Sequence, residues 1–382
     1  MGSQVTSPKL HHYVPQFYLR RFANDKDQIG VYQRASGKTF VAPVSQTGAE
    51  SGFYNILTED GEVSTVIETE VLSRVDSDGA AAIEEVLTGP FPPSDECRSI
   101  LAAYAGFQFA RGRMFREIYR VQSDFMMKAL AQQMTREHIR EGLRDTAGAE
   151  PTPEDIDQIE KILREPNSYT VAPHNNETIK VMMRMAEDSY PFFFKRRWVL
   201  VETPKSLITT DEPVVMWVNE KMKNSFFGVG LMTADELRFP LDANHMLVML
   251  QPDADITEDT VVLPDGARHL NPYHASTCYE YIYYHPDHRD SLDEVLEIVP
   301  LSTQRPITHI SSGFKDIAQG DTYALPVKPP RVKKVEWSEH CLQLDRRVFE
   351  IPRRHDCVTT IDGFGSMSDH FHRSDPGDAR PL

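Results

Sequence analysis

The chain has 382 residues, of which 40% are hydrophobic and 26% are charged, a composition typical of a soluble globular protein. No stretch approaches the roughly 20 apolar residues needed to span a bilayer, so we expect no membrane association. The net charge of −16 argues against a general nucleic-acid coat protein, because Lys and Arg carry phosphate binding.

The cysteines and the absence of a secretory signal indicate a cytoplasmic protein. Cys97, Cys278, Cys341 and Cys357 are far apart and form no metal-type pair, so we expect reduced thiols. No nucleotide-binding or metal-binding signature is present, and we therefore predict no cofactor and no metal. The spacing of His285-Pro286-Asp287-His288 is metal-like, but its proline and neighbouring charges favour an exposed loop.

The N-terminal part of the chain predicts a short helix followed by a hairpin. Residues 1–9 are polar, and we expect them to be flexible. His11 to Val14 is predicted to be extended, and the Pro15–Phe22 segment to be a short helix, because proline suits a helix start. Ile29–Arg34 and Thr39–Val44 alternate around a turn and predict a β-hairpin.

The middle of the chain has a helical pattern. From Ser64 onward, apolar residues recur every three or four positions. Ser94 is a good N-cap, and the apolar pattern that follows runs through Leu130, which predicts one long helix. We expect this helix to bend near Gly106 or Gly112. Further helices are predicted at Thr152–Glu165 and Asn175–Ser189.

Beyond Pro191 the pattern changes to strands. Four are predicted, at Trp198–Glu202, Leu207–Thr210, Val214–Trp217 and Met246–Gln251. Ala275–Tyr284 is predicted to be a helix, while Leu296–Val299 and Val332–Trp337 are weaker strand candidates and residues 356–382 a disordered tail. We therefore predict a single α+β domain over residues 10–355. Its mixed sheet, built from N-terminal and C-terminal strands, packs with a central helical region that includes one long helix.

Three groups of polar residues are candidates for a functional site. In the first, His12, Gln16 and Arg20 are spaced four apart, so a helix would place them on one face. His12 suits a general base, a proton shuttle or a metal ligand, because its charge changes near neutral pH. The alternative is a histidine that hydrogen-bonds a backbone carbonyl within a packed core.

The second group lies on the long helix, where Gln108 and Arg111 are three apart and point the same way. A buried arginine needs a carboxylate, a phosphate or a substrate anion. An ion pair with Glu68 or Glu70 on the preceding helix competes with a ligand contact.

The third group is Thr210 and Asp211, at the end of an apolar strand that stops before a proline-led turn. A carboxylate at such a strand end is a common place for catalysis or metal binding. The alternative is that both side chains cap the turn.

Local basic segments offset the overall negative charge. They are Arg111–Arg120, Lys195–Arg197 and Lys328–Arg354. Such segments are usually solvated faces and ion-pair partners, although a local patch would suffice to contact a nucleic acid.

The three groups, in this order, resemble the domain of unknown function 4238 family of bacteria and fungi. The resemblance rests on His12-Tyr13-Val14-Pro15-Gln16-Phe17-Tyr18-Leu19-Arg20 through Phe22, on Gln108 and Arg111, on Thr210-Asp211-Glu212-Pro213-Val214, and on Pro240-Leu241. It spans roughly residues 10–310. The chain departs from the family pattern at Thr209-Thr210-Asp211-Glu212, where Ser and Asn are commoner.

Similar sequences include fungal arginine-containing cyclodipeptide synthases, which form a diketopiperazine from aminoacyl-tRNA. The resemblance implies acyl transfer, which needs a proton shuttle, an oxyanion stabiliser and a carboxylate for the arginine guanidinium. We assign these roles as hypotheses: His12 as shuttle, Asp211 or Glu68 as guanidinium partner, and Arg111 as a ligand for the tRNA acceptor end.

Two other functions stay open. One is a phosphodiester hydrolase that acts in defence against foreign nucleic acid, with His12 and Asp211 around a metal. The other is a non-enzymatic binding protein with a structural polar network. The oligomeric state is not predicted.

Overall fold

The computed structural model describes residues 10–58, 61–218, 230–299 and 301. Several predictions lie outside these residues: the flexible N-terminus, the strand Val332–Trp337, the basic stretch Lys328–Arg354 and the tail from residue 356. Cys341 and Cys357 lie outside them as well. Within the described residues, Cys97 and Cys278 are buried free thiols, as expected.

The N-terminal elements are short strands around one short helix. They are β1 (Leu10–His12), α1 (Gln16–Arg20), β2 (Gln28–Gln33), β3 (Lys38–Pro43), β4 (Ala49–Ser51), β5 (Ile56–Leu57) and β6 (Val63–Ser64), with a 3₁₀ turn η1 (Val44–Gln46). The predicted helix after Pro15 and the predicted hairpin are both confirmed, since β2 pairs antiparallel with β3.

The middle of the chain is helical. It holds a π-helix η2 (Ile67–Leu72), α2 (Ser73–Thr88), α3 (Asp95–Ala110), α4 (Arg113–Gln133), α5 (Arg136–Ala147), α6 (Pro153–Arg164) and α7 (Asn175–Phe194). Ser94 caps α3 as predicted, because its hydroxyl accepts the Cys97 N–H at 3.1 Å. Thr152 caps α6 in the same way.

The single long helix predicted here is in fact two helices. Arg111 ends α3, and Gly112 is extended, with φ −70° and ψ 169°. The buried Glu212 carboxylate accepts the Met114 N–H at 2.8 Å and so caps the start of α4. A Cβ at position 112 would overlap this carboxylate, so any other residue here would displace Glu212 from the Met114 N–H. The predicted bend at Gly112 is therefore a complete break.

The last part of the chain alternates strands and helices. It contains β7 (Arg197–Glu202), β8 (Thr209–Thr210), β9 (Val215–Trp217), β10 (Glu236–Pro240), β11 (His245–Leu250), β12 (Thr260–Val262), α8 (Gly266–Ser276), β13 (Tyr281–Tyr284) and α9 (Arg289–Ile298). Sequence reasoning missed β10 and β12.

Two predictions in this part were wrong. The helix expected at Ala275–Tyr284 ends at Ser276, and Tyr281–Tyr284 instead pairs with β2 and β8. The strand expected at Leu296–Val299 belongs mostly to helix α9, which buries Leu292 and Val295 at helical spacing.

The elements form an α+β fold, as predicted. A four-stranded sheet, in the order β3-β2-β13-β8, joins N-terminal to C-terminal strands. A five-stranded sheet, in the order β12-β7-β11-β10-β9, comes from the C-terminal half alone. Three of the predicted strands lie in the shared sheet, where Ile29–Arg34, Thr39–Val44 and Leu207–Thr210 correspond to β2, β3 and β8. Three more lie in the second sheet, where Trp198–Glu202, Val214–Trp217 and Met246–Gln251 correspond to β7, β9 and β11.

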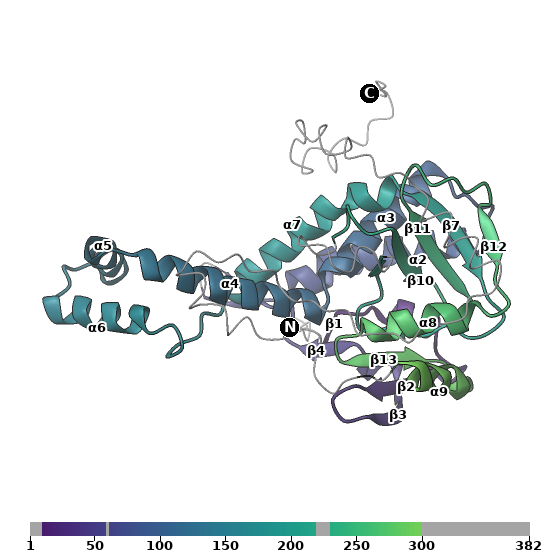
Figure 1. The fold of residues 1–382 in the computed structure, drawn as a ribbon, viewed down its shortest axis with the longest axis horizontal. Helices are drawn as coiled ribbons and strands as arrows, with labels where there is room; N and C mark the ends of the chain where they lie inside the picture. The colour runs from purple at the N-terminus through teal and green to yellow at the C-terminus, as the bar shows by residue number, and fades with distance from the viewer. Residues whose placement is uncertain (1–9, 59–60, 219–229, 300, 302–382) are drawn as a thin grey trace, which may run out of the picture.

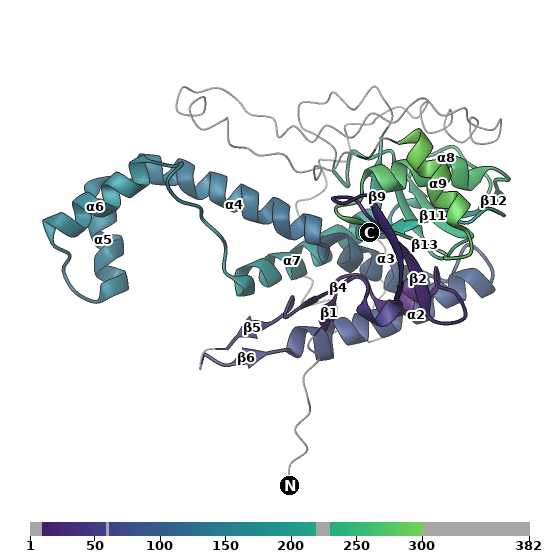
Figure 2. The ribbon, with the colours of Figure 1, turned by 90° about the horizontal axis from the view of Figure 1, so that it is seen from below.

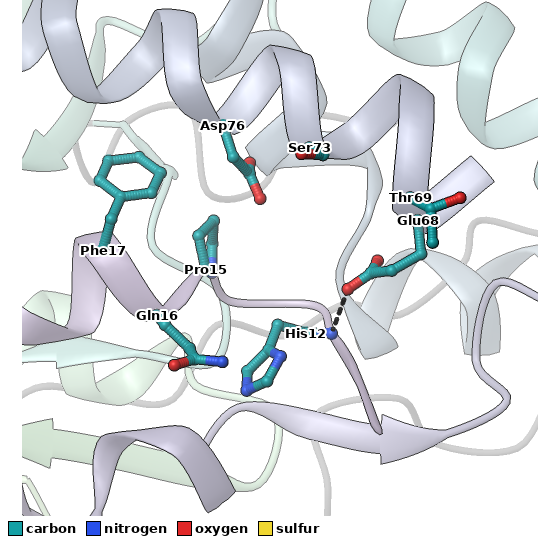
Figure 3. A pocket seen from close by; sticks show the side chains of 8 residues that line it. All are labelled: His12, Pro15, Gln16, Phe17, Glu68, Thr69, Ser73 and Asp76. Carbon is teal, nitrogen blue, oxygen red and sulfur yellow. Dashed lines mark hydrogen bonds between the residues drawn. The ribbon is translucent and has the colours of Figure 1, made fainter. Parts of the chain in front are cut away.

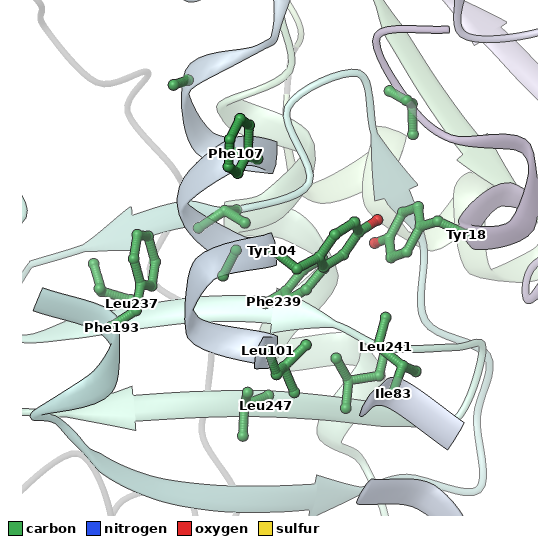
Figure 4. Packing of buried hydrophobic residues seen from close by; sticks show 14 of the residues in the cluster. Tyr18, Ile83, Leu101, Tyr104, Phe107, Phe193, Leu237, Phe239, Leu241 and Leu247 are labelled. Atoms are coloured by element: carbon green, nitrogen blue, oxygen red, sulfur yellow. The ribbon is translucent and has the colours of Figure 1, made fainter. Parts of the chain in front are cut away.

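Helices α2, α3 and α7 cover one face of the five-stranded sheet, and α8 covers the other (Figure 1). Figure 4 shows the first interface, where Leu101 and Tyr104 of α3 meet Phe239 and Leu247 of the sheet. Tyr18 of α1 joins them: its ring stacks on Phe239, and its hydroxyl donates to the Pro240 carbonyl at 2.8 Å. The N-terminal run is thus part of the main core.

Helices α4, α5 and α6 extend away from the two sheets as an arm (Figures 1 and 2). Little of the arm is buried, since α5 buries only Ile139 and α6 buries no residue. None of the helices in the described part of the chain combines the length and the apolar character that crossing a bilayer requires.

Candidate functional site

The backbone of the N-terminal run is held by the second predicted group. Gln108 and Arg111 are fully buried, and both donate to the Tyr13 carbonyl, Gln108 from Nε2 at 3.1 Å and Arg111 from Nε at 3.2 Å. Because both side chains bind the main chain, they fix the path of the run between β1 and α1. The two predicted groups therefore meet in space.

Arg111 also forms an ion pair with Asp76 of α2, at 2.7 Å. The Arg111 side chain is fully buried and that of Asp76 is 25% exposed. Burial raises the pKa of Asp76, although Arg111 opposes that shift. We expected Glu68 or Glu70 as the partner of Arg111, so the preceding helix was right and the residue was wrong.

The third predicted group, Thr210 and Asp211, holds a turn together through hydrogen bonds to the backbone; we call this arrangement the Asp211 clamp. Asp211 is fully buried, and its carboxylate accepts the backbone N–H groups of Tyr279, Glu280 and Tyr281 at 2.9, 2.7 and 3.0 Å. The Thr210 hydroxyl accepts the Glu212 N–H at 3.1 Å. This geometry matches the turn-capping alternative, and it ties β8 to the start of β13.

Burial dominates the titration of these carboxyl groups. It raises the pKa of Asp211 to about 6, although its three N–H donors oppose the shift. Burial, followed by repulsion from Asp211, also raises the pKa of Glu212 well above its ordinary value.

A pocket of about 370 Å³ lies between the N-terminal run and the helices η2 and α2 (Figure 3). Its wall comes from two segments of the chain. It is lined by His12, Pro15, Gln16, Phe17, Glu68, Thr69, Ser73 and Asp76. Glu68 and Thr69 belong to the π-helix, a rare conformation that occurs frequently at functional sites.

His12 is the titratable base of this pocket. Its backbone N–H donates to Glu68 Oε1 at 3.2 Å, and its imidazole Nε2 has no hydrogen-bond partner among the described residues. Burial lowers the pKa of His12, and the Ser45 carbonyl opposes that shift without cancelling it. The imidazole is therefore neutral near pH 7, and its Nε2 is a buried ring nitrogen without a hydrogen-bond partner among the described residues.

Glu68 supplies a carboxyl group next to His12. Burial raises its pKa, and the hydrogen bond from the His12 N–H opposes the shift. The contact between the two residues runs through the backbone N–H of His12, while the His12 ring and the Glu68 carboxyl line the same pocket. Asp76 places a second carboxylate on the same wall (Figure 3).

The structure divides the predicted site residues into three sets. His12, Gln16 and Glu68 line the pocket directly. Gln108 and Arg111 do not line the pocket, but Gln108 binds the Tyr13 carbonyl next to it and Arg111 binds its lining residue Asp76. Thr210 and Asp211 do not line the pocket.

Arg20 lies outside the pocket lining, in an exposed position. It donates to Gln16 Oε1 at 2.9 Å and to Asp27 Oδ1 at 3.0 Å. Its contact with the pocket is thus indirect, through Gln16.

Sequence reasoning missed five lining residues: Pro15, Phe17, Thr69, Ser73 and Asp76. A usable signal existed for three of them. Thr69, Ser73 and Asp76 recur at i, i+4 and i+7, so once Glu68 was a candidate they formed a polar stripe beside it.

Several arginines of the basic segments contact other groups of the protein. The Arg116 guanidinium lies 3.6 Å from the centre of the Phe53 ring, and Arg196 donates to four backbone carbonyls. Arg197 pairs with Asp259. Arg113 and Arg120 remain 25% and 42% exposed on α4.

Within the residues that the structure describes, no group of three or more His, Cys, Asp or Glu side chains is placed to hold a metal ion. His285 and His288 face each other with ring centres 5.0 Å apart, without a third such side chain beside them.

The sequence matches the family described as "Protein of unknown function (DUF4238)" over residues 10–288. The match covers β1 through the turn before α9, including the whole pocket and the Asp211 clamp. No curated protein and no solved structure matches the chain significantly. The chain belongs to the DUF4238 family of proteins of unknown function.

Proposed function

We propose that the protein is an acyl-transfer enzyme of the aminoacyl-tRNA-dependent cyclodipeptide-synthase type, with its active site in the His12 pocket. The observation that carries the proposal is a single pocket that holds a neutral imidazole, that of His12, together with the carboxyl groups of Glu68 and Asp76. Forming a peptide bond from an aminoacyl ester requires removing a proton from the attacking amine and returning one to the leaving hydroxyl. A neutral His12 is suited to both transfers.

Glu68 and Asp76 suit a cationic substrate side chain. Both carboxylates line the pocket, and a guanidinium is recognised by carboxylates that accept its parallel N–H groups. Asp76 already binds Arg111, so Glu68 is the carboxylate with more capacity for a second guanidinium. A volume of about 370 Å³ is within the range of small-molecule sites.

The geometry supports revised roles for two residues. Arg111 is fully buried between Asp76 and Tyr13, which favours a supporting role over contact with the tRNA acceptor end. The carboxylate oxygens of Asp211 already accept three backbone N–H groups, which favours Glu68 over Asp211 as the guanidinium partner. The exposed parts of Arg113 and Arg120 on α4 are then the described cations that we expect to contact tRNA phosphates.

The test is product formation by the purified full-length chain supplied with tRNA, an aminoacylation mixture and isotopically labelled arginine. We expect a labelled diketopiperazine by mass spectrometry, and its loss when ribonuclease destroys the tRNA. Glu68→Gln should raise the arginyl-tRNA concentration needed for half-maximal rate about tenfold, because it removes one charged hydrogen-bond acceptor.

Two results would contradict the proposal. Absence of product at saturating aminoacyl-tRNA would exclude the reaction. Cleavage of nucleic acid that disappears with a chelator and with His12→Ala would instead assign the phosphodiester hydrolase.

A further inference from the structure

The pocket contains an amide whose orientation is fixed by a neighbouring cation. Gln16 is the first residue of α1 and lines the pocket, and its Oε1 accepts a hydrogen bond from Arg20 Nη2 at 2.9 Å. A guanidinium has donors and no acceptor, so it binds the oxygen of an amide and not the nitrogen. The contact with Arg20 therefore defines which side of the Gln16 amide carries Nε2.

The amide nitrogen is directed into the pocket. Figure 3 shows Gln16 Nε2 pointing toward the His12 ring, with Oε1 on the other side of the amide. Nε2 has no hydrogen-bond partner among the described residues. Because an amide nitrogen donates hydrogen bonds and does not accept them, the pocket presents an oriented N–H donor on the same side as its titratable base.

Arg20 is itself held in place from a second side. Its Nε donates to Asp27 Oδ1 at 3.0 Å, so the guanidinium bridges a carboxylate and the amide. Gln16 and Arg20 lie four positions apart, on one face of α1. Tyr18 and Leu19 of the same helix are fully buried and anchor it in the core. A hydrogen-bonded chain from Asp27 through Arg20 to Gln16 thus orients one donor from an anchored helix.

The other polar side chains that line the pocket are less suited to bind a negative charge beside His12. The carboxyl groups of Glu68 and Asp76 repel an anion when they are ionised. The Thr69 hydroxyl donates to the Thr65 carbonyl at 3.1 Å. Ser73 belongs to the helical wall of the pocket, whereas Gln16 lies beside His12 on the wall formed by the N-terminal run (Figure 3).

We propose that Gln16 Nε2 is the donor that stabilises the oxyanion in this pocket and that Arg20 is its positioning residue, an assignment that rests on the acyl transfer proposed above. In that reaction the amine nitrogen of one aminoacyl group attacks the ester carbonyl carbon of the other. A C–N bond forms, and the π electrons of the carbonyl move onto its oxygen, which accepts the N–H of Gln16.

The same donor releases the oxygen in the second half of the step. The electron pair on the oxyanion re-forms the carbonyl, and the C–O bond to the tRNA ribose breaks with its electrons on the ribose oxygen. This leaving oxygen takes the proton that His12 removed from the amine. Gln16 contributes mainly while the negative charge exists, so it should act on kcat more than on KM.

The first test measures kcat and KM for diketopiperazine formation by two variants of Gln16. Gln16→Met keeps the length of the side chain and removes the amide, and kcat should fall about 10² to 10³-fold with KM nearly unchanged. Gln16→Glu keeps an acceptor for Arg20 and replaces the N–H donor by an oxygen, so it should lose at least as much. A purely structural role for Gln16 would leave Gln16→Glu active.

The second test distinguishes a positioning role of Arg20 from a structural one. Arg20→Ala frees the amide to rotate, so kcat should fall about tenfold. Arg20→Lys retains a donor for Oε1 and should recover part of the loss. In the Gln16→Met background, Arg20→Ala should have no further effect, because the amide that it positions is absent.

Arg289→Ala is the matched control for Arg20→Ala. The Arg289 ion pair with Asp293 joins side chains that are 50% and 55% exposed, and neither residue lines the pocket. The ion pair of Arg20 with Asp27 is equally exposed, at 50% and 49%. Arg289→Ala should therefore keep the native kcat, which shows that loss of an exposed ion pair alone does not slow the reaction.

The outcomes separate this assignment from the proposed function. A native chain that makes no diketopiperazine overturns both. A native chain that makes the product, with Gln16→Glu at the native kcat, overturns the oxyanion role of Gln16 and leaves the acyl transfer in place. Losses of Gln16→Met and Arg20→Ala that multiply in the double variant overturn the positioning role of Arg20. Thermal unfolding verifies that each variant is folded before its rate is measured.

Discussion

Two adjacent regions use the same types of polar side chain in different ways. In the buried network, Arg111 binds the Asp76 carboxylate and the Tyr13 carbonyl. Asp211 binds three backbone N–H groups. In the pocket, the His12 Nε2 has no hydrogen-bond partner among the described residues, and the Glu68 carboxyl accepts one hydrogen bond from them, the N–H of His12. Arg111 and Asp211, whose charged groups are bound within the protein, therefore have structural roles, while His12 and Glu68 line the pocket and are the candidates for chemistry.

His11 and His12 show the contrast between neighbours in the sequence. His11 is fully buried, its Nδ1 accepts the Tyr54 N–H at 2.8 Å, and its ring stacks on Tyr54. His12 points the other way, as successive residues of a strand do, and lines the pocket. The ring of His11 thus holds the β1 segment against Tyr54, and His12 lines the pocket.

The largest expected effect tests the buried network at Arg111. Arg111→Met should lower the free energy of unfolding by about 3 to 5 kcal/mol, because it leaves a largely buried Asp76 without its partner. Urea unfolding measures this loss. The double variant Arg111→Met/Asp76→Leu should recover much of it, and a double variant as unstable as the single one would contradict the ion-pair account.

The next effect concerns the pH dependence of the Asp211 clamp. Its pKa is about 6 in the folded state against an ordinary 3.8, so between pH 4 and 6 the folded state holds a proton that the unfolded state has released. The contribution of Asp211 to the free energy of unfolding is therefore greatest below pH 4 and falls by roughly 3 kcal/mol as the pH rises to 6. The stability difference between the native chain and Asp211→Asn should shrink over this window; a constant difference would show that Asp211 does not titrate there.

A smaller effect separates the two histidines. His11→Ala should cost about 1 to 3 kcal/mol, because the buried Tyr54 N–H loses its acceptor. His12→Ala should cost less, about 1 kcal/mol, because its Nε2 has no partner among the described residues and the ring loses only its hydrogen bond to the Ser45 carbonyl. Equal losses in denaturant unfolding would remove the distinction between the two regions.

The smallest effect is expected at Arg20. Its ion pair with Asp27 joins side chains that are 50% and 49% exposed. Arg20→Ala should therefore change the free energy of unfolding by less than about 1 kcal/mol. A change above that value in thermal unfolding would place Arg20 in the buried network instead.

Local signals predicted the elements whose formation depends on neighbouring residues. Pro15 and Ser94 mark the starts of α1 and α3 correctly, because a helix start depends on one or two side chains. Tyr281–Tyr284 was misread as helix, because a short apolar run fits either structure. The strand instead depends on distant partners: it pairs with β2 and β8, and Asp211, about 70 positions earlier, binds the N–H groups at its start.

The candidate site shows the same limit. His12, Gln16 and Glu68 were identified by residue type and spacing, and they line one pocket. Asp76 was missed because its pairing with Arg111 depends on how α2 lies against α3, which no local pattern defines. The break at Gly112 was misjudged for the same reason, since it depends on the distant Glu212.

The most direct test compares product formation by His12→Ala and His11→Ala, each measured on protein shown to be folded. We expect His12→Ala to lose about 10² to 10⁴-fold in rate, the usual contribution of general acid–base catalysis, while folded His11→Ala stays within about tenfold of the native chain. In the native chain, the lowered pKa of His12 should place the acidic limb of the proposed reaction's rate below pH 6.5. A folded His12→Ala that makes diketopiperazine at the native rate would contradict the account.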